Sequence, residues 1–139
     1  MTSTLKATFL FAIISFTVSV AQAQKELSEG EGQIIGIMPD LQKFVAELKS
    51  QSNAPFAILS DMDNGYALSL NLTVWVGAEL QKMLQERVNI PSFQGNSSWM
   101  LPIPATFVVG RDGLIIARFI DPDYRKRMTI TDMLAAMRS

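Results

Sequence analysis

Residues 99–124 read WMLPIPATFVVGRDGLIIARFIDPDY, and this stretch decides the predicted fold. The run ATFVV at residues 105–109 predicts a strand, because β-branched and aromatic side chains fit a pleated, half-buried surface. The Asp112-Gly113 pair that follows is typical of the tight turn between two antiparallel strands. Residues 114–120, LIIARFI, predict the returning strand. The stretch therefore predicts a C-terminal β-hairpin.

Amphipathic helices are predicted on both sides of this hairpin. After it, apolar residues recur with helical spacing and predict a closing helix; they are Ile130, Met133, Leu134 and Met137. Thr129 or Thr131 is the predicted cap of that helix. Before the hairpin, residues 77–88 predict another amphipathic helix, and residues 89–98, with Pro91 and Gly95, predict a loop.

A strand, a helix and a second strand are predicted further upstream. Residues 33–38, QIIGIM, form a continuous apolar run, which is typical of a strand buried on both faces of a parallel sheet. Asp40 is the predicted cap of a helix that ends near Asn53, and residues 56–60, FAILS, predict the second strand. The apolar face of this helix comprises Leu41, Phe44, Val45 and Leu48. Together with the hairpin, this order of elements predicts one α/β sandwich with a mixed sheet.

Length, composition and charge pattern favour a single packed domain and argue against nucleic-acid and metal binding. The chain has 139 residues, which favours one domain, and its 48% hydrophobic content favours a packed globule. The only dense basic group is Arg125, Lys126 and Arg127, which is too small to predict a nucleic-acid partner. Asp61 and Asp63 are predicted to form a turn with Asn64-Gly65 and not a calcium loop, which would need further ligands at set spacing. No metal, cofactor or nucleic-acid partner is predicted.

Two interpretations of the N-terminus remain open. Residues 1–6 carry one positive charge, residues 7–20 are mostly apolar, and Ala21-Gln22-Ala23 follows, which is the layout of a secretory signal peptide. On this interpretation residues 1–23 are removed, and residues 24–139 form a periplasmic or extracellular domain that is incomplete at its N-terminus. In the second interpretation, residues 1–23 contribute a first strand and the start of a helix to a cytoplasmic domain. The apolar run is too short to predict a stable membrane span.

Several short motifs recur in order between residues 33 and 138: IIGIMPD at residues 34–40, LSD at 59–61 with Asp63-Asn64, Trp99 with LPIPATFVV, Asp112-Gly113, Phe119, and DPDY at 121–124 with Arg127. These motifs resemble the peroxiredoxin-like branch of the alkyl hydroperoxide reductase/thiol-specific antioxidant family, in the thioredoxin-like superfamily. The resemblance implies a thioredoxin-like α/β sandwich. It also implies a redox function, because the antioxidant oxidoreductases of this family reduce peroxides with a thiol.

The chain departs from this family where the chemistry takes place. The family carries its peroxidatic cysteine in the zone that corresponds to residues 16–23, FTVSVAQA, and this sequence contains no cysteine and no histidine. A thiolate is the nucleophile of that reaction, and a serine in its place would need a base. The sequence therefore predicts a pseudoenzyme with no catalytic, cofactor-binding or metal-binding residues.

The resemblance also implies a former active-site groove at Pro104, Thr106 and Trp99. Ile103-Pro104 resembles the cis-proline element that faces the redox cysteines in thioredoxin folds, and the alternative is that Pro102 and Pro104 only fix the start of an edge strand. Three functions remain open: a non-catalytic binding or scaffold domain, a truncated part of an active thiol peroxidase, and an exported protein that binds a peptide or small ligand in the groove. The predicted partner surface is an open sheet edge, used for self-association or for another protein.

Overall fold

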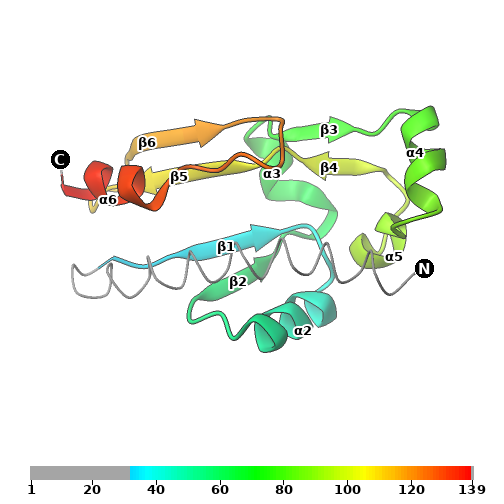
Figure 1. Cartoon of the computed structure of the whole chain (residues 1–139), viewed down its shortest axis with the longest axis horizontal. Coiled ribbons are helices and arrows are strands. Elements are labelled where there is room, and N and C mark those ends of the chain that lie inside the picture. Colours follow the sequence, from blue (N-terminus) through cyan, green and yellow to red (C-terminus); the bar gives the residue numbers. More distant parts are fainter. Residues whose placement is uncertain (1–31, 139) are drawn as a thin grey trace.

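The computed structural model describes residues 32–138, so the two interpretations of residues 1–23 lie outside the described residues. The described part is mixed α/β (Figure 1). Its elements in chain order are β1 (Ile35–Met38), α2 (Gln42–Ser52), β2 (Ala57–Ser60), the 3-10 turn η1 (Met62–Asn64), α3 (Gly65–Ser69), β3 (Thr73–Trp75), α4 (Ala78–Gln85), α5 (Ile90–Gln94), β4 (Met100–Pro102), β5 (Ala105–Val109), β6 (Ile115–Ile120) and α6 (Ile130–Arg138).

The predicted strand–helix–strand unit is confirmed. β1 and β2 pair in parallel, with Ile37 opposite Leu59, and α2 packs against β2 (Figure 1). A small core forms where the chain leaves α2 and enters β2: Ala54 and Phe56 are buried, with Ile34 and Ile58 packed against them. The parallel pairing follows from the crossover, because a helix between two strands carries the chain back to the same end of the sheet.

The prediction that Asp40 caps α2 is wrong. The helix begins one residue later, after Leu41, and no side chain caps its first turn. The backbone carbonyl of Asp40 instead accepts a hydrogen bond from the Ser60 hydroxyl at 2.5 Å, which ties the ends of β1 and β2 together. Burial raises the pKa of the Asp40 carboxyl, because a desolvated carboxylate loses hydration energy.

The C-terminal hairpin is confirmed as well. β5 and β6 are antiparallel, with Thr106 opposite Phe119 and an irregularity in register between Val108 and Val109. α6 packs against both strands (Figure 1). Of the two predicted caps, Thr129 is the one used, because its hydroxyl accepts a hydrogen bond from the Asp132 N–H at 3.1 Å.

Two features were not predicted. β3 and β4 form a short antiparallel ladder, with Val74 opposite Leu101. The predicted loop at residues 89–98 contains α5, whose start is capped by the Asn89 side chain, which accepts from the Ser92 N–H at 3.2 Å. Gly95 ends α5 in the left-handed conformation, with φ of 72°.

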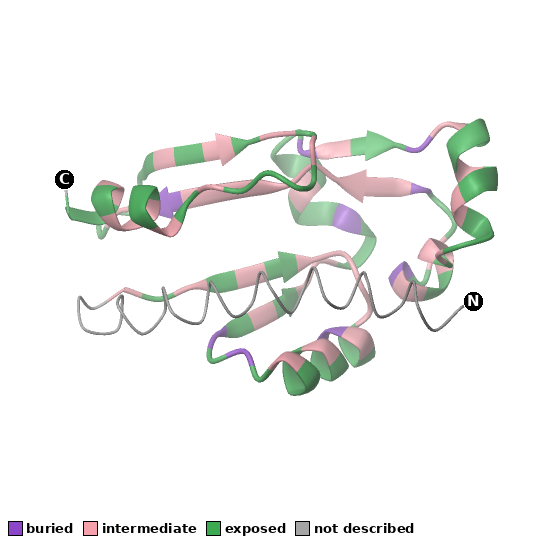
Figure 2. Ribbon diagram, viewed as in Figure 1, coloured by how far each residue is buried: buried purple, intermediate pink, exposed green. Residues whose placement is uncertain are grey.

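The strands of residues 32–138 form three separate two-stranded ladders, in contrast to the single mixed sheet predicted from the sequence. Within residues 32–138, no strand pairs with strands of two different ladders, so the ladders are not joined into one sheet. Consequently few side chains are fully enclosed, and exposed residues run along the strands (Figure 2). The buried hydrophobic residues are Val45, Ala54, Phe56, Leu72, Val76, Trp99 and Val108. No helix in this part of the chain is long and apolar enough to cross a membrane.

Candidate polar site and predicted groove

Polar side chains gather at the carboxyl ends of the parallel strands β1 and β2. Ser60, at the end of β2, bonds to the backbone of Asp40, which follows β1. Asp61 comes next, and its two carboxylate oxygens accept hydrogen bonds from the N–H groups of Tyr66 at 2.8 Å and Ala67 at 2.9 Å. The carboxyl ends of parallel strands are where open α/β sheets bind ligands, so this corner is the candidate site.

Asn64 is the most enclosed polar residue of this corner. It has no exposed surface and a φ of 55°, and its side-chain N–H donates to the carbonyl of Met100 at 3.0 Å. Within the described structure, its Oδ1 atom is buried and receives no hydrogen bond. The adjacent Asp63 accepts a hydrogen bond from the Asn96 side chain at 2.9 Å. Two contacts thus fix the corner, one to the first residue of β4 and one to the segment before it. The corner also holds one buried acceptor.

The sequence identifies this turn only in part. The Asn64-Gly65 pair predicts a positive φ, and the structure places positive φ at Asn64 and Asp63, while Gly65 begins α3 with a helical φ of −60°. What the pair does not reveal is that Asn64 is buried against a strand far along the chain.

The acidic residues of the corner do not form a metal centre. Among residues 32–138, no three His, Cys, Asp or Glu side chains form a group that could hold a metal ion. Asp61 is occupied by the first turn of α3, where the unpaired N–H groups of a helix favour a carboxylate. The Asp61 carboxylate and the Asn64 amide thus serve contacts within the chain.

The three predicted groove residues are placed at two different points. Trp99 is buried, has a φ of 56°, and its carbonyl accepts the Val76 N–H at 2.9 Å, just before β4. Pro104 lies beyond the other end of β4, where its carbonyl accepts the Asp121 N–H at 3.3 Å, and Thr106 follows in β5. β4 lies between Trp99 and Pro104, so the two residues stand beyond opposite ends of this strand. The structure therefore brings Pro104 and Thr106 together but not Trp99.

The Ile103–Pro104 bond is trans, since the described part of the chain contains no cis peptide bond. This differs from the cis-proline that the resemblance implies, and it matches the alternative in which proline fixes the start of a strand. A shallow hollow of about 520 Å³ lies elsewhere, along α2 and β2, and is lined by Gln42, Val45, Ala46, Lys49, Ser50, Asn53, Ala54 and Ile58. Ligand binding at Pro104 and Thr106 stays a prediction.

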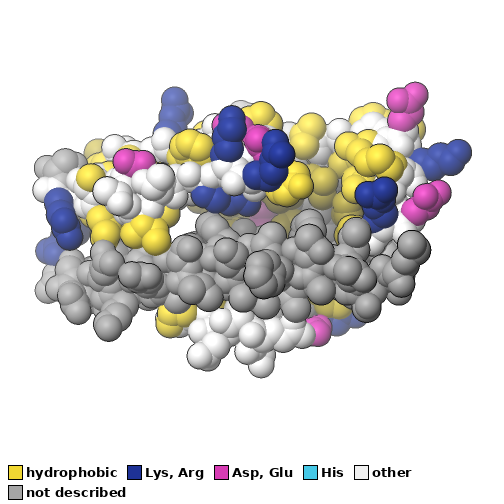
Figure 3. Space-filling view, viewed as in Figure 1, with side chains coloured by type: hydrophobic (Ala, Val, Ile, Leu, Met, Phe, Trp, Pro, Cys, Tyr) yellow, Lys and Arg dark blue, Asp and Glu magenta, His cyan; other side chains and the backbone are white. Residues whose placement is uncertain are grey.

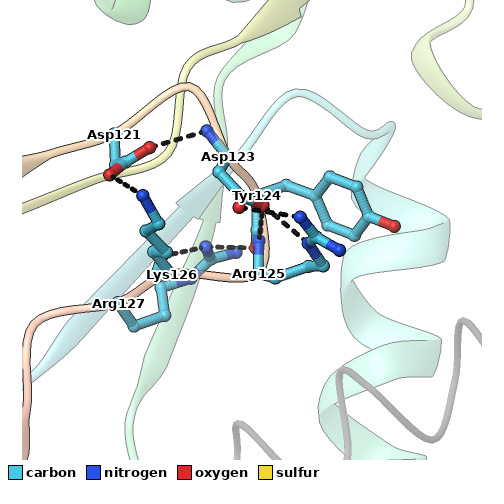
Figure 4. A network of polar contacts seen from close by, with 6 residues as sticks. All are labelled: Asp121, Asp123, Tyr124, Arg125, Lys126 and Arg127. Atoms are coloured by element: carbon cyan, nitrogen blue, oxygen red, sulfur yellow. Dashed lines mark hydrogen bonds and ion pairs between the residues drawn. The ribbon is translucent and has the colours of Figure 1, made fainter.

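The predicted basic group lies in the loop between β6 and α6 (Figure 4). The Arg125 guanidinium bonds to both carboxylate oxygens of Asp123, at 2.8 and 2.9 Å, and the Lys126 ammonium lies 3.1 Å from an oxygen of Asp121. Arg127 donates to the backbone carbonyls of Tyr124 and Lys126. These contacts hold the cations within their own loop.

Replacing Arg125 with glutamine is expected to raise the pKa of Asp123. The Arg125 hydrogen bonds are the main reason why this pKa is about 2 in place of 3.8, so their loss moves it back toward the ordinary range. A carbon-13 NMR titration of the carboxyl groups measures the change. Arg87→Gln, which alters an exposed residue outside this loop, is the control and should leave the Asp123 pKa unchanged. An Asp123 pKa near 2 in Arg125→Gln would contradict the assignment.

Hydrophobic side chains also reach the surface of the described residues (Figure 3). They include Ile35, Ile37 and Leu59 of the β1–β2 ladder and Ile115, Ile116 and Ile120 of β6. Strands normally bury such residues on at least one face of a sheet.

No protein-family model, curated protein or solved structure matches this chain. Function is therefore inferred from the residues and geometry of the chain itself.

Proposed function

We propose that this chain is a thioredoxin-like, peroxiredoxin-like domain that binds a partner and does not itself reduce peroxides. The observation that carries the proposal is the order of elements in a chain without cysteine. A parallel β1–α2–β2 unit is followed by α4, by the antiparallel β5–β6 hairpin and by α6, the order that the resemblance implies. The β3–β4 ladder and the trans bond before Pro104 are departures from that pattern.

The chemistry of the side chains excludes the family reaction for these 139 residues. Thiol-dependent peroxide reduction passes through a cysteine sulfenic acid, and the sequence holds no cysteine that could form one. A hydroxyl nucleophile would need an adjacent base, and the sequence holds no histidine for that role.

A peroxide-consumption assay tests the catalytic part of the proposal. The full chain, mixed with hydrogen peroxide and dithiothreitol, is expected to consume peroxide no faster than dithiothreitol alone, because it supplies no thiolate. An active cysteine-containing peroxiredoxin is the positive control. Consumption that saturates with peroxide and scales with the concentration of this chain would overturn the proposal. Peroxidase activity restricted to a longer native protein with an upstream cysteine would favour the truncated-peroxidase alternative.

A second candidate function is the binding of an extended peptide along β5. Within residues 32–138, β5 pairs only with β6, so its other edge carries unpaired backbone groups. Pro104 lies directly before this edge, and an added strand would obtain its affinity from backbone hydrogen bonds. Peptides selected from a displayed library should then protect amides of residues 105–109 from hydrogen exchange. Selected peptides that protect only other residues would exclude this candidate. Export of the domain stays a prediction.

A further inference from the structure

The Asn64-Gly65 pair combines a reactive dipeptide with a buried side chain. It is the only Asn-Gly pair in the sequence, and it lies where η1 ends and α3 begins. An asparagine side chain reaches the backbone nitrogen of the next residue, and a glycine there places no side chain in the way. In a flexible chain this nitrogen attacks the side-chain carbonyl carbon, which makes Asn-Gly the dipeptide most prone to deamidation.

The reaction consumes only water. The Gly65 nitrogen loses its proton and forms a bond to Cγ of Asn64, the bond between Cγ and Nδ2 breaks, and ammonia leaves with that proton. Water then opens the resulting five-membered succinimide at one of its two carbonyl carbons. The products are aspartate and isoaspartate, and in isoaspartate the backbone runs through Cγ.

The described structure blocks this attack at three points. Asn64 has no exposed surface, and its Nδ2 atom, the leaving group, donates to the Met100 carbonyl at 3.0 Å. The Gly65 N–H, the nucleophile, donates to the Met62 carbonyl. Asn64 is also held at φ 55° and ψ 30°, whereas ring closure needs a rotation about ψ that brings the nitrogen to Cγ. Deamidation therefore requires that η1 and β4 first separate.

The fold does not require glycine at position 65. Gly65 has a helical φ of −60°, and an added Cβ would lie 3.9 Å from Asp61 Oδ1, which is an ordinary contact. Alanine is also the better helix former. Gly65→Ala therefore removes the reactive dipeptide while leaving the corner intact.

The product cannot occupy the corner as asparagine does. Within the described structure, Asn64 Oδ1 is already buried without a hydrogen bond, and the reaction replaces Nδ2, the donor to Met100, with a second oxygen. Burial of a carboxylate without partners is costly. We propose that Asn64-Gly65 is a deamidation site that the folded corner protects, and that its reaction prevents the corner from closing again. This inference goes beyond the proposed function and does not rest on it.

Mass spectrometry of aged protein tests the protection. The full chain is incubated at mildly alkaline pH, either native or unfolded in guanidinium chloride, and fragmentation of its peptides locates the residue that has changed from asparagine to aspartate or isoaspartate. The native rate at Asn64 is expected to be at least about tenfold below the unfolded rate, because only the open fraction reacts.

Unfolded Gly65→Ala is the control for the reactive dipeptide and should deamidate at Asn64 far more slowly than the unfolded wild type. Equal native and unfolded rates in the wild type would show that the corner gives no protection. Equal rates in the two unfolded proteins would show that the dipeptide is not reactive. Either result would overturn the inference.

A second variant tests whether the opening is local to this corner. The Asn96 side chain donates to Asp63 at 2.9 Å, so Asn96→Ala removes one contact between η1 and the segment before β4. This variant is expected to raise the native rate at Asn64 by about two- to tenfold, the net effect of one hydrogen bond, and to leave the unfolded rate unchanged. An unchanged native rate would contradict a local opening.

Asn64→Asp, which has the side chain of one product, tests whether the corner can close again. Its thermal midpoint is expected to lie about 4–8 °C or more below that of the wild type. Asn71→Asp is the matched control, because Asn71 also has a positive φ, of 56°, but is exposed. The control should shift the midpoint by less than about 2 °C, and an equally small shift for Asn64→Asp would overturn the second part of the inference.

If Asn64→Asp fails to fold, aged wild type gives the same information. The protein is deamidated in guanidinium chloride, returned to native conditions and exposed briefly to a protease. Molecules modified at Asn64 are expected to be digested faster than unmodified molecules in the same sample, because their corner stays open. Equal digestion of the two forms would show that the product is accommodated, and would overturn the inference.

Discussion

Replacing Phe56 with alanine is expected to lower the free energy of unfolding by about 3–5 kcal/mol. Phe56 is 7% exposed and forms the centre of the small core with Ala54, against which Ile34 and Ile58 pack. Truncation removes the buried ring and leaves a cavity that the two short strands can fill only in part. Because domains are stable by about 5–15 kcal/mol, the loss is a large share of the total.

Denaturant unfolding followed by circular dichroism measures this effect. Tyr124→Ala is the matched control, since it also removes an aromatic ring, but from a residue that is 67% exposed. The control should change the free energy of unfolding by no more than about 0.5 kcal/mol. A loss below about 1 kcal/mol for Phe56→Ala would show that Phe56 does not lie in the core.

Replacing Gly95 with alanine is expected to cost about 2–5 kcal/mol. Gly95 has a φ of 72°, and a left-handed backbone costs a residue with a Cβ about 1–2 kcal/mol. The added Cβ would also lie 2.8 Å from Leu41 Cδ2 and 3.2 Å from Leu41 Cγ. Leu41 is held nearby because its N–H donates to the Phe93 carbonyl at 2.8 Å, so relief of this overlap costs about another 1–3 kcal/mol.

Gly113→Ala separates the two contributions. Gly113 has a φ of 82°, but a Cβ there would meet no atom within 4 Å, so only the backbone cost of about 1–2 kcal/mol applies. Thermal or denaturant unfolding of both variants gives the comparison. If Gly95→Ala destabilises no more than Gly113→Ala, then α5 does not pack against Leu41.

The elements that the sequence predicts well are those with a local signal. Phe44 and Val45 belong to a helical apolar face, and α2 forms there. The β-branched run at residues 105–109 becomes β5 with the predicted bounds. These patterns succeed because periodicity and β-propensity act within a few neighbouring residues.

The elements that the sequence does not predict depend on distant partners. β3 and β4 have three residues each, which is too short to show an alternating pattern. They form as strands because they pair with each other, with Thr73 opposite Pro102. The sequence does not predict α5, because Pro91 and Gly95 are both typical of loops. Proline is also common in the first turn of a helix and glycine at its end, and these are the positions that the two residues occupy in α5.

The candidate site is the least predictable part. The Asn64 contact joins residues 36 positions apart, which no local pattern reports. The resemblance places Trp99 in a groove, whereas in the structure Trp99 is buried and its backbone carbonyl accepts the Val76 N–H. Aspartate is a residue type that often caps helices, which is why Asp40 is predicted as the cap. The helix instead begins after Leu41, and the Asp40 carboxylate does not cap it.

Parallel pairing of β1 with β2 is the feature on which the proposed function most directly depends. NMR of the isotopically labelled full chain measures it directly, through interstrand nuclear Overhauser effects. Contacts that follow the parallel register, with Ile35 near Ala57 and Ile37 near Leu59, are the predicted result. An antiparallel pattern, with Ile35 near Leu59 and Ile37 near Ala57, or no contact between the two strands, would contradict it.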